Sequence, residues 1–230
     1  MKKSERLDQY LLLKNPEILW QEFNESTRRA IKKAIKKGLV IKRVDDESII
    51  KEVYELQLNF GKKIGFLDFS YKDYLKIWKK LNPPGFFDIF IAKKNEEIIA
   101  FMAFLNFRDK VLYRMGASNK EGKKTGAHRL ITWEAIKWSY QRGYKIFDFG
   151  PSGLLEKNGE VEEKFRGLVD YKSFFNSIKT PFSYYYFPKS VSINKIDYQT
   201  VRVRIGKGII KYLPNPILAR ISTFLIKKNI

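Results

Sequence analysis

The hydrophobic positions of the chain follow two spacings, one typical of helices and one typical of strands. Between Pro16 and Gly38 the apolar residues recur at helical spacing, which predicts a helix with Asn15 as its N-cap. Ser26 is expected to interrupt this helix and to act as a second cap. Further helices are predicted after Asp46, from Ser70, and from about residue 125 to Arg142.

Shorter apolar runs between turn-forming residues predict strands over 9–13, 39–44, 86–92, 98–107, 111–117, 144–149 and 181–187. Short polar turns separate the middle strands, which is typical of an antiparallel meander. The polar stretch 153–167 is expected to be a mobile loop or a short helix. This order of elements predicts an α/β (α+β) fold with a mixed, mostly antiparallel sheet flanked by helices.

Composition restricts the chemistry more than it restricts the fold. The 230 residues, 44% of them hydrophobic, suffice for one packed domain with an appendage. The chain has no cysteine and one histidine, which excludes disulfides, thiolate zinc sites, cysteine nucleophiles and His-rich metal clusters. We therefore expect no metal and no bound cofactor. Neither a membrane span nor a signal peptide is predicted, so a cytoplasmic protein is expected.

The charge balance points to anionic partners. Lys and Arg number 45 against 25 Asp and Glu, so that the formal net charge is +20. An excess of this size predicts nucleic acid, a phosphorylated substrate or an anionic membrane face as the partner.

The basic residues are densest on one predicted helix. Its cations fan over about half of the circumference, and no Asp or Glu lies between Glu25 and Asp45. A helix selected only for solubility would mix both signs, so we interpret this face as phosphate-binding; the alternative is a solvated basic face. The cations are Arg28, Arg29, Lys32, Lys33, Lys36 and Lys37, of which Arg28, Arg29, Lys32 and Lys36 are the expected phosphate ligands.

Four segments resemble, in order, the motifs of the FemABX-like family. They are Leu19-Trp20 with the basic stretch that ends in Lys37-Gly38, Tyr113 to Ser118 with its Gly-Ala-Ser end, Leu130 to Gly150, and Gly167 to Phe175. The resemblance covers about residues 9–190. It implies a GNAT fold and the activity of aminoacyl- and peptidyltransferases associated with peptidoglycan cross-bridges.

The resemblance also implies a division of the chain. Members of that family usually carry two GNAT-like domains, so residues 1–37 are expected to be the remnant of a first domain and residues 38–190 the acyltransferase domain. Residues 191–230 form a basic amphipathic tail, for which two interpretations stay open. The tail either lies on the inner, anionic face of the cell membrane or packs back on the domain.

The segment before the long helix bears on the acyl donor. An acyl-CoA-dependent GNAT enzyme carries there a turn of the form Arg/Gln-x-x-Gly-x-Gly/Ala, whose amides bind pyrophosphate. Here Gly126 matches the first glycine, but His128 stands at the second. This favours aminoacyl-tRNA over acyl-CoA as the donor, with Lys123 and Arg129 as further phosphate ligands. The expected reaction moves an activated amino acid onto an amine of a cell-envelope precursor.

Candidate catalytic residues follow from the same motifs. Lys172, which matches the family's lysine, is expected to stabilise charge at the reacting carbonyl; the alternative is a surface lysine on a loop. Asp148 is expected to orient the amine or act as a base, and its alternative is an Asx-type turn. Tyr171 either stacks on a base or ribose or belongs to the core, and His128 is interpreted as a capping or packing residue. A non-catalytic RNA- or membrane-binding module remains the third interpretation of the chain.

Overall fold

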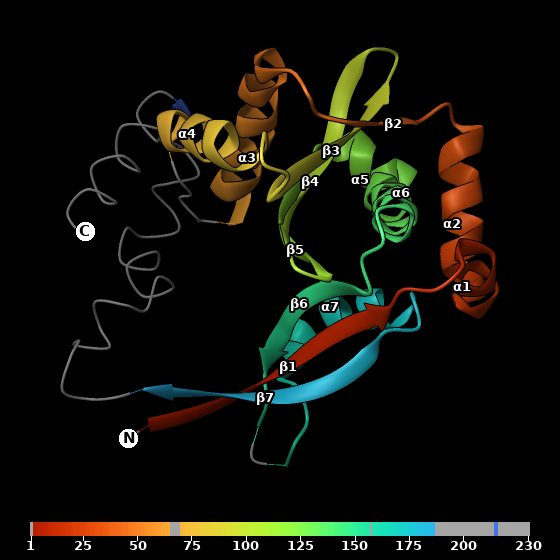
Figure 1. Ribbon diagram of the computed structural model, residues 1–230, viewed down its shortest axis with the longest axis vertical. Helices are drawn as coiled ribbons and strands as arrows, with labels where there is room; N and C mark the ends of the chain where they lie inside the picture. Colours follow the sequence, from red (N-terminus) through yellow and green to blue (C-terminus); the bar gives the residue numbers. More distant parts are fainter. Residues whose placement is uncertain (1, 65–69, 157, 187–213, 216–230) are drawn as a thin grey trace.

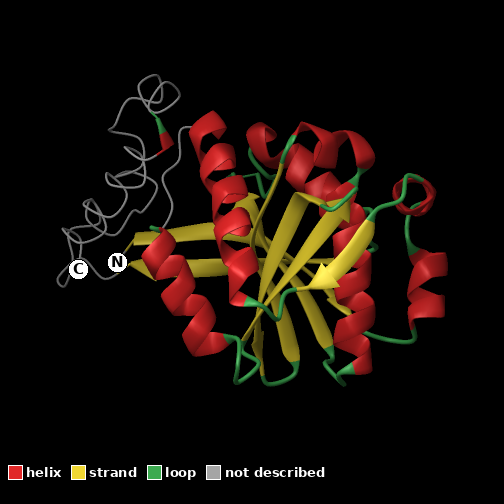
Figure 2. Cartoon of the chain, turned by 90° about the horizontal axis from the view of Figure 1, so that it is seen from above, coloured by secondary structure: helices red, strands yellow, loops and turns green. Residues whose placement is uncertain are grey.

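The computed structural model describes residues 2–64, 70–156, 158–186 and 214–215, and these form one sheet covered by helices on both faces (Figures 1 and 2). The seven strands lie in the order β2-β3-β4-β5-β6-β1-β7. Neighbouring strands are antiparallel except for β5 and β6, which are parallel. The predicted mixed, mostly antiparallel sheet is therefore confirmed.

The strands are β1 (Lys2–Leu12), β2 (Val40–Arg43), β3 (Phe87–Lys94), β4 (Glu97–Phe107), β5 (Lys110–Ser118), β6 (Ile146–Leu154) and β7 (Ile178–Tyr186). The helices are α1 (Pro16–Glu22), α2 (Glu25–Lys36), α3 (Ile50–Ile64), α4 (Tyr71–Leu81), α5 (Lys120–Thr125), α6 (Ala127–Gln141) and α7 (Arg166–Ser173). Two short 3-10 helices, η1 (Glu47–Ile49) and η2 (Glu163–Phe165), precede α3 and α7. None of the helices in the described part of the chain is long and apolar enough to cross a membrane.

The N-terminal helical region departs from the expectation in where it breaks. Phe23 separates α1 from α2, and its side chain is buried in the core. Asn24, and not Ser26, caps α2, because the Asn24 side chain accepts a hydrogen bond from the Ser26 backbone N–H at 2.9 Å. Ser26 is exposed within the helix. The predicted cap at Ser26 was therefore wrong by two positions.

The predicted strand 144–149 is too short at its C-terminal end, because β6 continues to Leu154. This extension pairs with β1, whose strand begins at Lys2 and so is longer than the predicted 9–13. The expected loop or short helix over 153–167 contains η2 and the start of α7. The meander of β3, β4 and β5 is confirmed.

Two hydrophobic clusters occupy the two faces of the sheet. Leu19 of α1, Ile31 of α2 and Ile136 of α6 pack in one cluster, and Val53 of α3 packs with Trp78 of α4 in the other. Figure 1 shows α3 and α4 on one side of the sheet and α2, α5 and α6 on the opposite side.

The described part of the segment 1–37 shares this core with the rest of the chain. Strand β1 lies between β6 and β7, and α2 packs against α6. The origin of this segment as the remnant of a first domain stays a prediction. The predicted tail, 191–230, lies outside the described residues apart from Pro214 and Asn215.

Candidate functional site

The parallel strands β5 and β6 pair over only three residues and then separate. The pairs are Lys110 with Ile146, Val111 with Phe147 and Leu112 with Asp148, although both strands continue well beyond them. A register shift opposite Ala103 and Phe104 of β4 leaves Arg114 without a partner residue and bends β5 at this point. Beyond Leu112, β5 therefore has a paired neighbour only on the β4 side.

A cavity of about 380 Å³ lies where the strands have separated. Its lining residues come from α3 (Phe60), β5 (Tyr113, Gly116, Ser118), the α5–α6 segment (Lys123, Gly126, His128, Arg129) and α7 (Tyr171). A second cavity, of about 570 Å³, is lined by Leu56, Asn59, Phe60, Lys62, Lys63, Ser118 and Asn119. Because Phe60 and Ser118 line both, we treat the two as one groove, called here the β5 groove.

The β5 groove is positively charged. Lys62 and Lys63 of α3, Lys123 of α5 and Arg129 of α6 line it, and none of the lining residues is Asp or Glu. A groove lined by charges of one sign attracts ligands of the opposite sign, because its low-dielectric walls focus the electric field into the groove. An anionic ligand therefore fits this surface.

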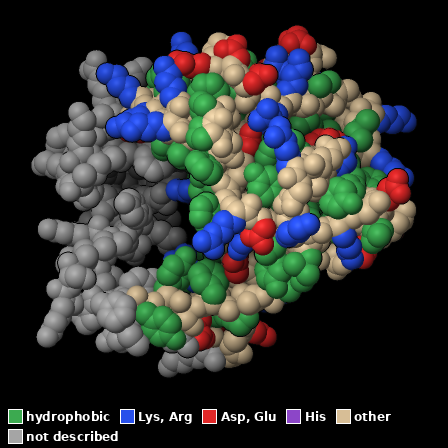
Figure 3. Space-filling model, in the orientation of Figure 1, with side chains coloured by type: hydrophobic (Ala, Val, Ile, Leu, Met, Phe, Trp, Pro, Cys, Tyr) green, Lys and Arg blue, Asp and Glu red, His purple; other side chains and the backbone are tan. Residues whose placement is uncertain are grey.

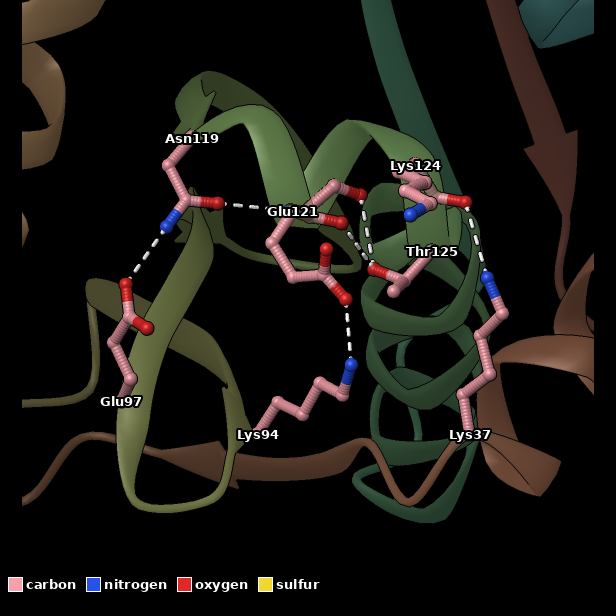
Figure 4. Close-up of polar contacts among 8 residues, drawn as sticks. Lys37, Lys94, Glu97, Asn119, Glu121, Lys124 and Thr125 are labelled. Carbon is pink, nitrogen blue, oxygen red and sulfur yellow. Dashed lines mark hydrogen bonds and ion pairs between the residues drawn. The ribbon is translucent and has the colours of Figure 1, made fainter.

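Helix α5 is held against the sheet by its own N-cap and by two acidic residues (Figure 4). The Asn119 side chain accepts a hydrogen bond from the Gly122 N–H at 2.8 Å and donates to Glu97 at 3.0 Å. Glu121 pairs with Lys94 of β3 at 2.6 Å. Gly126, with φ +76°, then turns the chain from α5 into α6, a conformation that a residue with a side chain rarely adopts. These contacts place Lys123 and His128 at the groove.

His128 is a residue whose role the sequence did not reveal. Burial lowers the pKa of its imidazole below the ordinary value, whereas hydrogen bonding to the Ala117 backbone acts in the opposite direction and nearby Lys123 adds to the lowering. Its Nε2 is buried and has no hydrogen-bond partner. In the sequence, this residue is distinguished only by its place at the second glycine position of the turn, and it is interpreted there as a capping or packing residue.

Tyr171 lies on α7 and links that helix to α6. Its hydroxyl is 3.0 Å from the Thr132 hydroxyl, and the Arg129 guanidinium carbon lies 5.6 Å from the centre of its ring. Burial raises the pKa of Tyr171 to about 12 and also raises the pKa of Tyr113. Both phenols are therefore neutral at physiological pH. Three of the predicted binding residues therefore line the same cavity: Lys123, Arg129 and Tyr171.

The predicted catalytic pair lies elsewhere. Lys172 is not a surface lysine: it is 2% exposed on α7, and its ammonium donates to the carbonyl oxygens of Gly150 and Pro151 at 2.6 and 3.0 Å. Burial lowers the pKa of Lys172 to about 8. This lysine is not among the residues that line the groove. Its expected role at a reacting carbonyl stays a prediction, with no support from this geometry.

Asp148 forms the turn-like contact that was its alternative interpretation. One carboxylate oxygen accepts the Gly150 N–H at 2.7 Å, and the other pairs with Lys110 at 2.9 Å. That hydrogen bond raises the pKa of Lys110. Since both oxygens are engaged and Asp148 does not line the groove, the geometry favours a structural role.

The predicted phosphate ligands of α2 also lie outside the groove. Arg28 bonds to the Gln21 side chain at 3.2 Å, and Arg29 lies 3.7 Å from Glu25. Lys32 and Lys36 are exposed, on a helix that packs against α6. At the end of α2, Lys37 donates to the carbonyl of Lys124 at 3.4 Å (Figure 4), which joins the basic face of α2 to α5.

The residues that the structure describes contain no group of three or more His, Cys, Asp or Glu side chains that could hold a metal ion. The lining of the groove consists of cations, hydroxyls, amides, an imidazole and apolar groups. These groups can bind an anion, donate hydrogen bonds to a carbonyl oxygen, and accept a proton.

A mixed sheet with one parallel pair that separates beside a basic groove defines the class as an acyltransferase of GNAT type. The comparison with protein families agrees: the pattern of the acetyltransferase (GNAT) domain matches residues 21–173. The chain belongs to this family. The fold that the sequence motifs implied is thereby confirmed.

Several solved structures share this fold. FemX matches with a TM-score of 0.64 and 17% identity, over 86% of this chain and 64% of FemX. The C-terminal domain of a putative lysylphosphatidylglycerol synthetase from Agrobacterium fabrum matches with a TM-score of 0.57 and 13% identity, over 79% of this chain and 60% of that chain. L-PGS from Bacillus licheniformis matches with a TM-score of 0.54 and 14% identity, over 79% and 61%.

This chain therefore spans less than two thirds of the length of those proteins. Among the curated proteins compared, none matches it. At these identities the likeness concerns the fold, and the substrates have to be argued from the groove.

Proposed function

We propose that this protein transfers an activated amino acid from aminoacyl-tRNA to an amine of a cell-envelope precursor. The observation that carries the proposal is the β5 groove, which is lined by four cations and no acid beside the point where β5 and β6 separate. FemX and the C-terminal domain of a putative lysylphosphatidylglycerol synthetase share its fold, and the latter is named for joining lysine to phosphatidylglycerol.

The chemistry that the groove must serve is aminolysis of an ester. The amine attacks the acyl carbonyl, a tetrahedral oxyanion forms, and the hydroxyl of the tRNA ribose leaves. Arg129, which lines the groove, can stabilise the oxyanion by its positive charge. Three further cations of the groove can bind phosphates of the donor: Lys62, Lys63 and Lys123. Tyr171, whose ring lies against Arg129, supplies a surface for stacking on a base or ribose.

His128 supports a tRNA donor over acyl-CoA. Pyrophosphate of CoA needs close approach to the backbone at the start of α6, and a second glycine or an alanine gives it that room. Here the imidazole of His128 lines the cavity at that position. A single-stranded acceptor end of tRNA has its phosphates spaced further apart and does not depend on this one turn.

The basic face of α2 is the second argument for a long donor. The four predicted phosphate ligands of α2 do not line the groove, so a small donor such as CoA, bound in the groove, is not expected to contact them. They are Arg28, Arg29, Lys32 and Lys36. A tRNA extends beyond the groove, and Lys37 and Lys124 connect the two basic surfaces. We propose that these α2 cations contact tRNA phosphates outside the groove.

A transfer assay with charged tRNA and acyl-CoA donors, run side by side on the same amine acceptors, tests the proposal. We expect the labelled aminoacyl group to appear on the acceptor with charged tRNA and no product with acyl-CoA. Product only with acyl-CoA contradicts the choice of donor but keeps the acyltransferase class. The amine of a muropeptide serves as the cell-envelope acceptor in this assay. Binding to vesicles of anionic lipid, measured separately, tests peripheral membrane association.

An acyl-CoA-dependent N-acyltransferase is the second candidate. Gly126 and the start of α6, which no side chain caps, favour it, because that geometry suits a pyrophosphate. Calorimetry with CoA distinguishes the two: binding of CoA without a response to charged tRNA supports this candidate. Binding of RNA or anionic vesicles without any transfer would instead support a non-catalytic module.

A further inference from the structure

Two consecutive residues of α6 carry unpaired, buried polar atoms at the same cavity. His128 Nε2 and Arg129 Nε have no hydrogen-bond partner, and both residues line the 380 Å³ cavity. Burying a polar atom without a hydrogen-bond partner is unfavourable, so each such atom needs an explanation, and at a cavity a ligand or a catalytic role can provide it. These two atoms therefore indicate which hydrogen-bonding groups a ligand of this cavity carries.

The free nitrogen of His128 is a hydrogen-bond acceptor. The ring bonds to the Ala117 backbone, and since Nε2 is unpaired, that bond uses Nδ1 as the donor. With the proton on Nδ1, a neutral imidazole presents a lone pair at Nε2. Burial and the charge of Lys123 lower the pKa of this histidine, which keeps the ring neutral at physiological pH.

The groups around the ring are consistent with a proton acceptor. Lys123 of α5 and Arg129 of α6 are positive, and Tyr113 of β5 and Tyr171 of α7 are phenols with raised pKa values. The α3 residue that lines this cavity is Phe60, and Lys62 and Lys63 of α3 line the adjoining part of the groove. No carboxylate lines the cavity to hold a permanent proton on the imidazole.

A lone pair at Nε2 is a poor neighbour for phosphate, because both are hydrogen-bond acceptors. The matching ligand atom is an N–H or O–H donor. Arg129 Nε, in contrast, is a donor and matches a carbonyl oxygen or an oxyanion. Together the two atoms match an amine that attacks a carbonyl.

We propose that His128 Nε2 is the proton acceptor for the attacking amine, with Arg129 facing the oxyanion. This inference rests on the proposed function. The amine nitrogen forms a bond to the acyl carbon as its proton moves to Nε2, and the carbonyl electrons move to the oxygen. When the tetrahedral intermediate collapses, the acyl C–O bond breaks and the proton passes from His128 to the leaving ribose oxygen.

Nε2 is covered by protein atoms in the structure. The proposal therefore includes a movement of a covering side chain that uncovers this nitrogen when the amine enters, while Nδ1 keeps its bond to Ala117.

Kinetics of His128→Gln test the role directly. Glutamine keeps the size and polarity of the side chain but cannot take a proton at neutral pH. We expect kcat to fall by about 100-fold or more, with little change in donor Kd, and the acidic limb of the pH profile to disappear. Imidazole added to His128→Ala is expected to restore part of the rate. Lys145→Ala, an exposed position in the segment between α6 and β6, is the matched control for expression and folding.

The two levels of the proposal fail differently. A wild-type protein that transfers from no donor contradicts the proposed function itself. A wild-type protein that transfers, with His128→Gln equally active and with the same acidic limb, overturns only the role of His128. Far-UV circular dichroism and the urea midpoint identify any variant that has lost its fold, for which His128→Asn replaces His128→Gln.

Because the chain has one histidine, its imidazole nitrogens give an isolated NMR signal. A long-range ¹H–¹⁵N spectrum of the full chain is expected to show the Nδ1–H tautomer at neutral pH and a pKa below 6.5. A proton on Nε2, or a pKa above that value, overturns the inference without any activity measurement.

Discussion

Lys172 shows most clearly how a single residue changes meaning when its surroundings are known. The sequence motif predicts that this lysine stabilises charge at the reacting carbonyl. In the structure its ammonium is buried and donates hydrogen bonds to two carbonyl oxygens of β6. Those carbonyls lie where β6 and β1 change register, so the ladder leaves them in need of donors. The lysine stabilises the irregular part of β6.

This burial predicts a pH dependence of stability. The pKa of Lys172 is about 8 in the fold against an ordinary 10.5, so between these values the unfolded chain binds more protons than the folded chain. The free energy of unfolding therefore rises with pH from about 8 towards 10. We expect Lys172→Met to lose this rise, measured as urea midpoints at pH 7, 8, 9 and 10.

Lys145→Met is the control, because its lysine is exposed. Measurements stop at pH 10, since Tyr113 and Tyr171 have raised pKa values and lower the stability at higher pH. Equal slopes in Lys172→Met and the wild type would contradict the buried, weakly basic ammonium.

At the scale of elements, the break between α1 and α2 gives a direct comparison of two capping residues. Asn24 accepts the Ser26 N–H, whereas Ser26 is an exposed helical position. We expect Asn24→Ala to lower the free energy of unfolding by about 1 kcal/mol and Ser26→Ala to leave it nearly unchanged. Chemical denaturation of both variants measures this difference. A larger loss of unfolding free energy for Ser26→Ala than for Asn24→Ala would show that Ser26 is the N-cap, as the sequence predicted.

Helix α5 approaches the sheet too closely for any side chain at Gly122. A Cβ there would overlap the Ile99 carbonyl oxygen and lie 2.9 Å from the Ser118 Cβ. We expect Gly122→Ala to lower the free energy of unfolding by about 1–3 kcal/mol and to reduce donor binding, because α5 carries Lys123 to the groove. Both are measured on the same preparation, by denaturation and by calorimetry.

Gly167 of α7 is the matched control, since a Cβ there meets no atom within 4 Å. Alanine is a better helix former than glycine, so Gly167→Ala is expected to raise the stability by about 0.5–1 kcal/mol. A Gly122→Ala protein as stable as the wild type would mean that α5 moves freely on the sheet.

At the scale of the whole molecule, the formal net charge is +20. On the face shown in Figure 3, Lys and Arg are distributed among Asp and Glu rather than gathered in one patch. On this face, charge alone therefore does not locate a partner. The groove and α2 differ from the rest because acids are absent from the groove lining and rare on α2.

The contribution of α2 distinguishes a tRNA from a small donor. Removing two phosphate contacts lowers the slope of log K against log salt by about 1.4 for a single strand and somewhat more for a duplex. We expect Lys32→Ala with Lys36→Ala to produce such a drop for charged tRNA, measured by filter binding at several salt concentrations, and to leave acyl-CoA binding unchanged.

Lys72→Ala with Lys76→Ala removes the same charge from exposed positions of α4, on the opposite face of the sheet. If this control weakens tRNA binding as much as the α2 variant does, the effect is one of net charge, and the proposed α2 contact is incorrect.

The sequence was informative where contacts are local. The meander, the caps at Asp46 and Ser70 and the long helix α6 were all predicted, because apolar spacing and capping residues act within a few positions. The separate helix α5 was missed, since its six residues are too few to show a period. The order of motifs was enough to identify the fold class.

The tertiary structure decided the groove. Lys62 of α3, Lys123 of α5 and Tyr171 of α7 are far apart in the chain, and only the separation of β5 from β6 brings them to one surface. It also decided that Lys172 is buried and that His128 has an unpaired nitrogen. Burial and pairing depend on distant elements, and a local pattern of residues does not contain that information.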